Sequence, residues 1–522
     1  MTRFSILLLL LLTAHAQAEP ASSPRTAPPP NTATPGWNPA LATDVTATAL
    51  TFMAPRILEP IPVAQLALWG LSGLTALDPS LGVSLRDGQL RLAAADRMLV
   101  VRPPPPDNNP RAWAQTAAEF ATAAWGVSAP VRKAGTEGVL HAFFDEMFNH
   151  LDPYSRYVAP QEAAEDRARR TGRAGAGITL TPQGNAVFVQ AVIADGPGAR
   201  AGLRPGDRIL AVDEQSTAGH DVAVVTGWIA GPEDTTVTIA LRTRDGRTRT
   251  VRLLREMVPP ETVFAERAGE VLILRVTGFN YRTNARLERE LIRGIAGPRP
   301  PSGIVLDLRG NRGGLLREAV AIADELLNAG VIAITAGRDP DASRVWRSFD
   351  GAQATDLPAV VAVDGRSASA AEILAAALAD RGRAVVVGSS TLGKGLVQTI
   401  APLPDGGELF VTWSRVLAPL GWPIQGLGVL PQVCTSLGPE ALERQLQTLN
   451  AGSQPMAPAI ARHRAARAPL PSAQVLAIRG ACPAAEARDA DMDAARFLIT
   501  HPAAYAAALL APTAGLDAPA AR

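Results

Sequence analysis

The chain has 522 residues, of which 47% are apolar and 19% charged, so it is long enough for about three domains with buried cores. A net charge of +1 provides no broad basic field, and aromatic residues make up only 5%. This composition argues against a nucleic acid as the main partner.

The first 18 residues have the three parts of a secretory signal. Arg3 supplies the positive start, residues 4–12 form an apolar stretch, and Ala16-Gln17-Ala18 matches a small-residue cleavage site. The stretch is shorter than the roughly 20 residues of a membrane-spanning helix, although an uncleaved anchor is the alternative. We expect a protein secreted across the inner membrane into the periplasm, with a disordered leader over residues 19–39.

Residues 40–172 are expected to form a mostly helical N-terminal domain. A short hairpin is predicted near residues 83–92, and the last helices are predicted over residues 138–150 and 160–170. Between those two helices lies Leu151-Asp152-Pro153-Tyr154-Ser155, a segment with the composition of a turn.

Residues 173–256 contain short β-branched runs bounded by turn signals, at 186–192, 208–212, 235–242 and 248–254. Residues 198–209 resemble the helix and "AGL-x-x-GD-x-I" turn of PDZ domains; an unrelated β domain with an incidental turn is the alternative. Where PDZ domains bind a peptide carboxylate, this chain has Gly175, Ala176, Gly177 and Ile178. The resemblance implies capture of a peptide C-terminus by backbone N–H groups at a sheet edge.

Strands alternate with helices over residues 257–437. Apolar runs at 271–276, 303–308, 359–363 and 384–387 predict strands, and periodic segments at 283–295, 315–327 and 370–380 predict helices. This pattern indicates an α/β core, to which residues 140–172 are expected to contribute. Residues 438–522 are Ala-rich and predicted helical, with no recognisable chemistry.

Cofactor and metal motifs are missing from the sequence. There is no phosphate-binding loop, no dinucleotide fingerprint and no H-E-x-x-H pair, and the histidines are scattered. We therefore expect neither cofactor nor metal. Cys434 and Cys482 are the only cysteines; in an exported protein they predict a disulfide, worth about 4 kcal/mol by loop closure, whereas two buried thiols are the alternative.

Two segments of the α/β core can carry nucleophilic chemistry. Ser369 lies at a predicted strand-to-helix turn, and Lys394, between two glycines, follows the next strand. A desolvated lysine can lose its proton and accept one from a serine, and Gln398 lies where it can orient that amine. Only two of the 50 basic residues are lysines, Lys133 and Lys394. The alternatives are a helix cap formed by Ser369 with Glu372, and a solvated glycine loop.

The chain resembles the C-terminal processing peptidases, or tail-specific proteases, of serine peptidase family S41. The resemblance rests on five segments in the family's order: 151–155, 306–316, 364–373, 391–398 and 423–429. It implies a ClpP/crotonase-like α/β peptidase core with an inserted, mainly-β PDZ domain, and helical N- and C-terminal regions. It also implies a Ser369/Lys394 dyad supported by Gln398, with the backbone N–H groups of Ala370 and of Gly313 in the Gly313-Gly314 turn as oxyanion donors.

The chain departs from the family pattern at Arg312, where a proline is usual, and at Gln432, where an acidic residue is common. Ser367 is the competing nucleophile. The expected function is exported serine endopeptidase activity on proteins or peptides recognised by their C-termini, without nucleic acid or metal. A catalytically weak peptide-binding scaffold and an apolar-ligand carrier are the alternatives, and the sequence does not indicate an adaptor or an oligomeric state.

Overall fold

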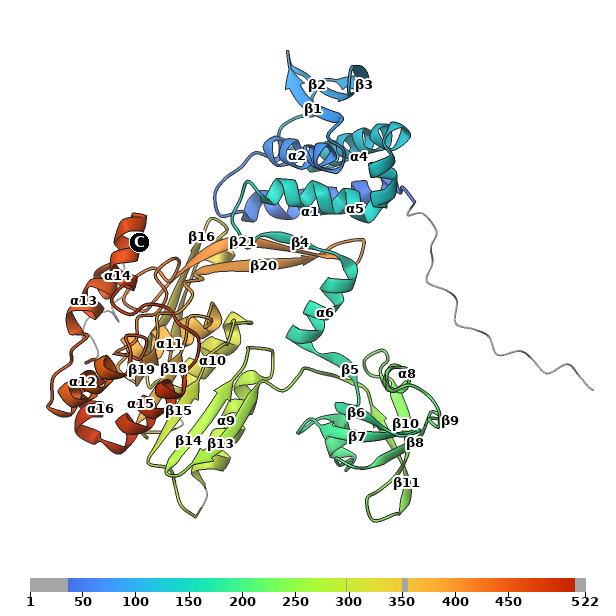
Figure 1. The fold of residues 1–522 in the computed structure, drawn as a ribbon. Helices are drawn as coiled ribbons and strands as arrows, with labels where there is room; N and C mark the ends of the chain where they lie inside the picture. Colours follow the sequence, from blue (N-terminus) through green and yellow to red (C-terminus); the bar gives the residue numbers. More distant parts are fainter. Residues whose placement is uncertain (1–35, 297, 350–354, 512–522) are drawn as a thin grey trace, which may run out of the picture.

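The computed structural model describes residues 36–296, 298–349 and 355–511. The predicted signal and most of the predicted leader lie outside these residues. Among the residues described, no helix is long and apolar enough to cross a membrane. Figure 1 shows an N-terminal helical domain, a central core and a β-rich domain on a connecting helix.

The N-terminal domain is a helical bundle capped by a small sheet. Its helices bury one shared core, which includes Trp113, Phe120 and Phe144. The bundle consists of α1 (Pro39–Arg56), α2 (Val63–Leu71), α3 (Gly73–Leu77), α4 (Pro110–Val127) and α5 (Ala129–Phe148). The expected hairpin is present as β1 (Leu81–Arg86) and β2 (Gln89–Ala94), and β3 (Arg97–Arg102) adds a third antiparallel strand that the sequence did not predict.

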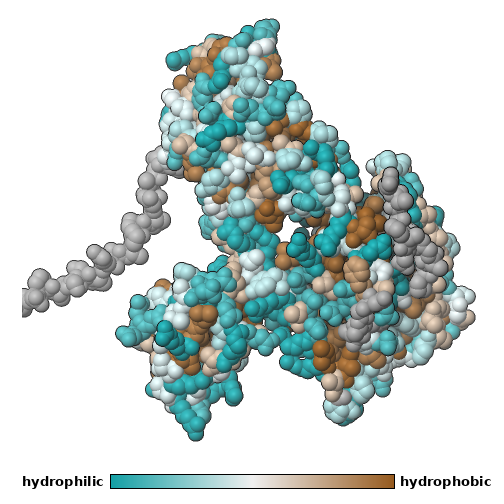
Figure 2. Space-filling model, turned by 180° about the vertical axis from the view of Figure 1, so that it is seen from behind, coloured by the Kyte–Doolittle hydropathy of each residue, from teal (hydrophilic) through white to brown (hydrophobic). Residues whose placement is uncertain are grey.

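The β-rich domain has the sheet order β11-β10-β8-β7-β6, so β6 is an edge strand. It contains β6 (Ile178–Gln183), β7 (Ala186–Val192), α7 (Pro197–Arg200), β8 (Arg208–Val212), β9 (Gln215–Ser216), α8 (Val222–Ile229), β10 (Thr236–Arg242) and β11 (Thr248–Leu254). A two-stranded ribbon of β5 (Arg173–Gly175) and β12 (Glu256–Val258) joins it to the rest of the chain. Figure 2 shows this domain as a separate lobe.

The core is built on a six-stranded sheet of order β13-β14-β15-β18-β19-β22. From β14 onward all neighbours are parallel, because each strand is followed by a crossover helix or loop. The strands are β13 (Val263–Ala268), β14 (Val271–Val276), β15 (Gly303–Asp307), β18 (Ala359–Val363), β19 (Ala384–Gly388) and β22 (Val433–Cys434). Strands β15, β18 and β19 are buried along their whole length, as their continuous apolar runs predict.

Helices cover both faces of this sheet. On one face lie α9 (Thr283–Ile295), α10 (Leu316–Leu326) and α11 (Ala370–Asp380). The other face packs against α12 (Pro439–Asn450), α15 (Asp489–Thr500) and α16 (Pro502–Ala508). The predicted boundary at residue 437 therefore does not separate two packing units, because the C-terminal helices bury the second face of the core sheet. Helices α13 (Ala457–Ala465) and α14 (Ser472–Arg479) complete this region.

A second sheet connects the core to the other two domains. Its order is β17-β16-β21-β20, with β4 (Arg156–Val158) also paired to β21. The long strands are β16 (Gly330–Gly337), β17 (Arg344–Ser348), β20 (Leu396–Pro402) and β21 (Glu408–Leu417). Side chains of the β20–β21 hairpin enter the core of the N-terminal domain.

Helix α6 (Pro160–Thr171) runs from this hairpin to the β-rich domain (Figure 1). Arg167 and Arg170 on this helix pair with Glu408, which is only 4% exposed, at 2.9 and 2.6 Å. Because both arginines pair with one buried carboxylate on β21, helix α6 is fixed to the β20–β21 hairpin.

Candidate active site

Ser369 occupies a strained turn between β18 and α11. Its backbone has φ 57° and ψ −117°, a region that is costly for a residue with a side chain, by about 1–3 kcal/mol. A serine that serves only as a helix cap has an extended backbone instead. Capping alone therefore does not explain Ser369, and such strain is typical of functional residues.

The competing nucleophile, Ser367, is excluded by its surroundings. Its side chain is fully buried and donates to Leu308 O at 2.8 Å, and it accepts from the N–H of Asp364 at 3.0 Å. Ser369 is only half-buried. Of the two serines, Ser369 alone is accessible to a substrate.

The turn that follows β15 packs directly against Ser369. A Cβ added to Gly313, which has φ 96°, would lie 2.8 Å from Ser369 Cβ and 3.0 Å from Ala370 N. The prediction that the Gly313 N–H faces an oxyanion is wrong, because that N–H donates to Asn311 Oδ1 at 2.8 Å. In the described part of the chain the N–H groups of Ala370 and Gly314 donate to no protein group, which makes this pair the candidate oxyanion donors.

Gly313→Ala is expected to lower the kcat of the expected peptidase activity about 100-fold. The methyl group of the alanine would displace the Ser369 turn by a fraction of an ångström or more. Gly310→Ala is the matched control: Gly310 also has positive φ, at 72°, but an added Cβ meets nothing within 4 Å. Both variants carry a similar backbone cost of about 1–2 kcal/mol. Steady-state kinetics with thermal unfolding tests this; equal kinetics for the two variants would contradict the contact.

Lys394 lies in the loop after β19, next to the Ser369 turn because β18 and β19 are parallel neighbours. Its Nζ lies 4.7 Å from the centre of the Tyr154 ring. Burial lowers the pKa of Lys394 below its usual range, and nearby Arg156 lowers it further, whereas Asp152 and Glu372 oppose the shift. Among the described residues no hydrogen bond joins Lys394 to Ser369.

Glu372 connects the two segments. Its carboxylate accepts hydrogen bonds from the N–H groups of Ser369 and Lys394, each at 2.8 Å. The other oxygen accepts from Gly393 N at 2.6 Å and from Thr391 Oγ1 at 2.5 Å. Glu372 is fully buried; burial raises its pKa, and the four donated hydrogen bonds oppose that shift. From the sequence, Glu372 is expected only as half of a capping box with Ser369. No local sequence pattern indicates its hydrogen bonds to the loop that carries Lys394, here named the lysine loop.

Gln398 does not contact Lys394, contrary to the prediction that it orients the amine. A register shift between Val397 and Gln398 places its Nε2 3.0 Å from Thr412 Oγ1 on β21. Thr412 in turn donates to Asp152 at 2.7 Å. Gln398 is thus linked through Thr412 to the 151–155 turn, which carries Tyr154.

The β-rich domain has an open sheet edge at strand β6. Gly175 ends β5 and Ile178 begins β6, and between them Ala176 is buried and Gly177 has φ 66°. The carbonyls of Ala176 and Gly177 are engaged by Gly198 and Ile193, whereas in the described chain their N–H groups donate to no protein atom. Two adjacent free N–H groups at a sheet edge next to α8 suit a carboxylate.

Comparison with known proteins identifies two domains in this chain. Residues 270–435 match the model of peptidase family S41, and residues 188–243 match that of the PDZ domain. A carboxy-terminal-processing protease of Bartonella bacilliformis is 34% identical over 292 residues, which are 55% of this chain and 67% of that protein. This chain belongs to the carboxy-terminal-processing proteases of family S41. The core is thus an S41 peptidase domain, and the β-rich domain is its PDZ domain.

The match covers about two thirds of the length of the curated relatives. A CtpA-like relative of Staphylococcus epidermidis is 30% identical over 58% of this chain and 62% of its own. Among solved structures, the photosystem II D1 C-terminal processing protease is 26% identical, with a TM-score of 0.34, over 73% of this chain and 96% of that one. The PDZ domain of a Vibrio cholerae carboxy-terminal protease, solved with a peptide, is 23% identical with a TM-score of 0.16, over 17% of this chain and 98% of that one.

Four further observations concern the S41 core. No cluster of three or more histidine, cysteine or acidic side chains placed to hold a metal ion occurs among the described residues. Cys434 and Cys482 form a disulfide, with their Cα atoms 5.7 Å apart, and both side chains are fully buried. Arg312 is exposed beside the oxyanion turn, and Gln432 is buried and accepts from Val386 N at 2.7 Å.

Proposed function

We propose that this S41 protein is an exported serine endopeptidase that uses Ser369 as nucleophile and Lys394 as general base. The observation that carries the proposal is the shared carboxylate of Glu372, which accepts from the backbone N–H groups of both residues. The strained backbone of Ser369 and the burial of Lys394 support it, because each is costly and each suits the assigned role.

In the proposed reaction the neutral amine of Lys394 takes the hydroxyl proton as Ser369 Oγ attacks the scissile carbonyl carbon. The tetrahedral oxyanion accepts hydrogen bonds from Ala370 N and Gly314 N. The Lys394 ammonium then protonates the leaving amine, and water hydrolyses the acyl-enzyme with the same base. Since Lys394 Nζ lies over Tyr154, its side chain must rotate toward Ser369 before the first step, which its four flexible methylenes allow.

Ser369→Ala tests the assignment of the nucleophile. It removes the attacking atom, so cleavage of an unfolded protein substrate should fall to background while thermal unfolding and peptide binding stay unchanged. Labelling of the wild type by a fluorophosphonate should also disappear. Cleavage by this variant at the wild-type rate would show that the hydrolysis occurs elsewhere.

The PDZ domain is proposed to hold the C-terminal tail of the substrate, as an added strand between β6 and α8. The support is the pair of free N–H groups at Ala176 and Gly177 next to the open edge of β6. Within the described chain, one side-chain ion pair joins the PDZ domain to α9, the exposed contact between Asp195 and Arg289. Such sparse contacts suit a domain that moves over the active site.

A peptide with a free C-terminal carboxylate is expected to bind at least tenfold more tightly than the same peptide amidated at its C-terminus, because the amide adds donors where the loop already supplies donors. Fluorescence anisotropy with Ser369→Ala protein, which does not cut the peptide, measures both affinities. Equal affinities would exclude carboxylate capture.

Export to the periplasm is the remaining part of the proposal. It rests on the signal-like residues 1–18 and on the disulfide, a bond that forms in oxidising compartments. Fractionation of cells expressing the full chain, with and without residues 1–18, tests it; recovery of the full chain in the cytosolic fraction would oppose it.

A further inference from the structure

Residues 479–491, here named the strap, run from the last residue of α14 into the first turn of α15 and contact the loops around the candidate active site. On the lysine loop, Ser390 Oγ donates to Cys482 O at 2.6 Å, and Arg479 donates to Thr391 O at 2.8 Å. Ser389 Oγ contacts Ala485 through both O and N, each at 3.0 Å. Three consecutive residues before Lys394's own turn are therefore tied to the strap.

The strap also contacts the turn between β18 and α11 that ends at Ser369, here named the nucleophile turn. Gly365 N donates to Ala485 O at 2.7 Å. A Cβ at Gly365 would lie 3.1 Å from that oxygen and 3.2 Å from Ala484 Cβ, so the strap lies directly on the turn that leads to Ser369. Ala485 thus contacts the nucleophile turn and the lysine loop at once.

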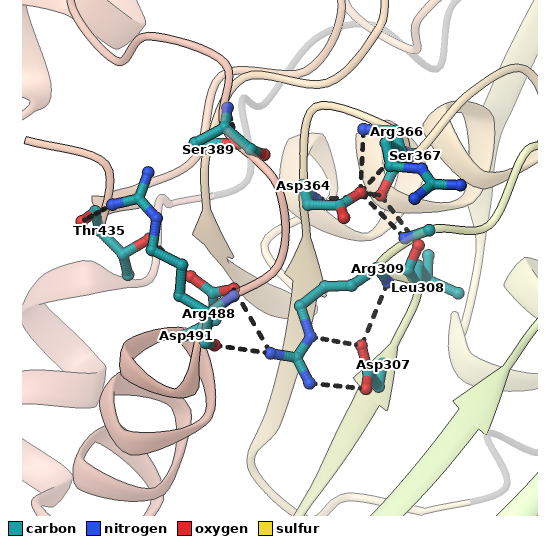
Figure 3. Close-up of polar contacts among 12 residues, drawn as sticks. Asp307, Leu308, Arg309, Asp364, Arg366, Ser367, Ser389, Thr435, Arg488 and Asp491 are labelled. Atoms are coloured by element: carbon teal, nitrogen blue, oxygen red, sulfur yellow. Dashed lines mark hydrogen bonds and ion pairs between the residues drawn. The ribbon is translucent and has the colours of Figure 1, made fainter.

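The third contact is with the turn that carries the oxyanion donor. Arg309 forms a two-pronged ion pair with Asp307, at 2.8 and 2.9 Å, and its remaining nitrogen donates to Arg488 O at 2.8 Å. The same nitrogen lies 3.4 Å from Asp491 at the start of α15. Figure 3 shows Arg309 between Asp307 on one side and Arg488 and Asp491 on the other. The arginine is five residues from Gly314.

The disulfide fixes the strap to the core sheet. Cys482 lies within the strap, and Cys434 ends β22, the strand paired with β19. Gln445 holds the Cys434 backbone through both N and O, at 3.0 and 2.8 Å. Many other contacts of the strap are hydrogen bonds to its backbone carbonyls, and the segment between α14 and α15 has no regular secondary structure. The disulfide is a covalent bond and is therefore the strongest constraint on the position of the strap.

We propose that the strap positions the three loops that carry the catalytic groups: the turn that ends at Ser369, the loop that carries Lys394 and the turn that carries Gly314. Closure of the Cys434–Cys482 disulfide then completes the active site. The inference rests on the proposed Ser369/Lys394 chemistry. In the closing step the two thiols lose two protons and two electrons to a disulfide oxidant, which becomes a dithiol. The reduced chain is then a weak protease and the oxidised chain an active one, so that activity follows arrival in an oxidising compartment.

The test compares purified full-length variants for kcat, KM, thermal unfolding and the rate of fluorophosphonate labelling against pH. Cys434→Ser with Cys482→Ser removes the bond without leaving a thiol, and kcat should fall at least about tenfold with KM and peptide affinity unchanged. Ser390→Ala keeps the disulfide but removes the 2.6 Å bond to the strap; it should also lower kcat and shift the pH of half-maximal labelling. Ser436→Ala is the matched control, since Ser436 Oγ lies 3.3 Å from the Cys434 sulfur and 3.4 Å from the Cys482 sulfur and, among the described residues, forms no hydrogen bond to the loops that carry the catalytic groups; it should keep wild-type kinetics.

The outcomes separate the two proposals. Full kcat and an unchanged labelling profile in both the double cysteine variant and Ser390→Ala, at a temperature where both are folded, would overturn the strap proposal. If the double variant does not fold, Ser390→Ala against Ser436→Ala decides alone. Absence of cleavage and of labelling in the oxidised wild type would instead reject the proposed Ser369 chemistry.

Discussion

Replacing Lys394 with arginine is expected to lower the rate of proteolysis by about 10²–10⁴-fold, the usual contribution of a general base. Arginine keeps the positive charge and most of the side-chain length, but its guanidinium does not lose a proton in proteins. The substitution therefore removes the base and keeps only the positive charge of the protonated amine. Measuring kcat/KM on an unfolded protein substrate gives the result; a retained rate would mean that Lys394 only stabilises the loop.

The chain supplies its own control for this substitution. Lys133, the only other lysine, is exposed on α5. Lys133→Arg should leave kcat/KM and thermal unfolding unchanged, because Lys133 is exposed on helix α5 and takes no part in the proposed proton transfer. A comparable loss in both variants would point to a nonspecific effect of arginine.

The same control makes the protonation state of Lys394 measurable. In Lys133→Arg protein, Lys394 is the sole lysine, so reductive methylation with a ¹³C label gives one side-chain resonance to titrate. Burial lowers the pKa of Lys394 below its ordinary 10.5. The neutral amine is the base, so proteolysis should rise with pH through this lowered pKa and be lost below it. A titration midpoint at or above 10.5 would exclude a preformed neutral base.

The sequence predicted the core elements well, because burial on both faces leaves an unambiguous apolar pattern. The strand at 359–363 and the helix at 370–380 occur with the predicted bounds. The positions of Ser369 and Lys394 after neighbouring strands follow from the same alternation.

The errors at the site have specific physical causes. A register shift turns Gln398 toward Thr412, and no sequence pattern reveals a bulge of this kind. The N–H of Gly313 donates to the side chain of Asn311, a local competition that leaves the N–H of Gly314 as the candidate donor. The strap was missed because it acts through carbonyls of residues such as Ala485, which any sequence provides.

Glu372→Gln is expected to lower kcat about 100-fold, the order of loss for a displacement of about 1 Å between reacting groups. Each of the two carboxylate oxygens of Glu372 accepts two hydrogen bonds. The amide of a glutamine offers one accepting oxygen and one NH₂ group, which only donates. That NH₂ would face either the N–H groups of Ser369 and Lys394 or the donors of Gly393 and Thr391. Two buried donors lose their acceptor, at about 1–3 kcal/mol each, and the two loops separate.

Charge gives Glu372→Gln a second effect that a purely structural residue would not have. The carboxylate raises the pKa of Lys394 against the effect of burial, so removing its charge should shift the acid limb of the pH–rate profile to lower pH. Glu318→Gln is the control, because Glu318 is a partly buried carboxylate on α10 that, like Glu372, accepts a backbone N–H, in this case from Asn284 at 2.9 Å. It should lose stability without a change in kcat or in the profile. If Glu372→Gln behaved in the same way, the carboxylate would hold the fold together but would not set the distance between nucleophile and base.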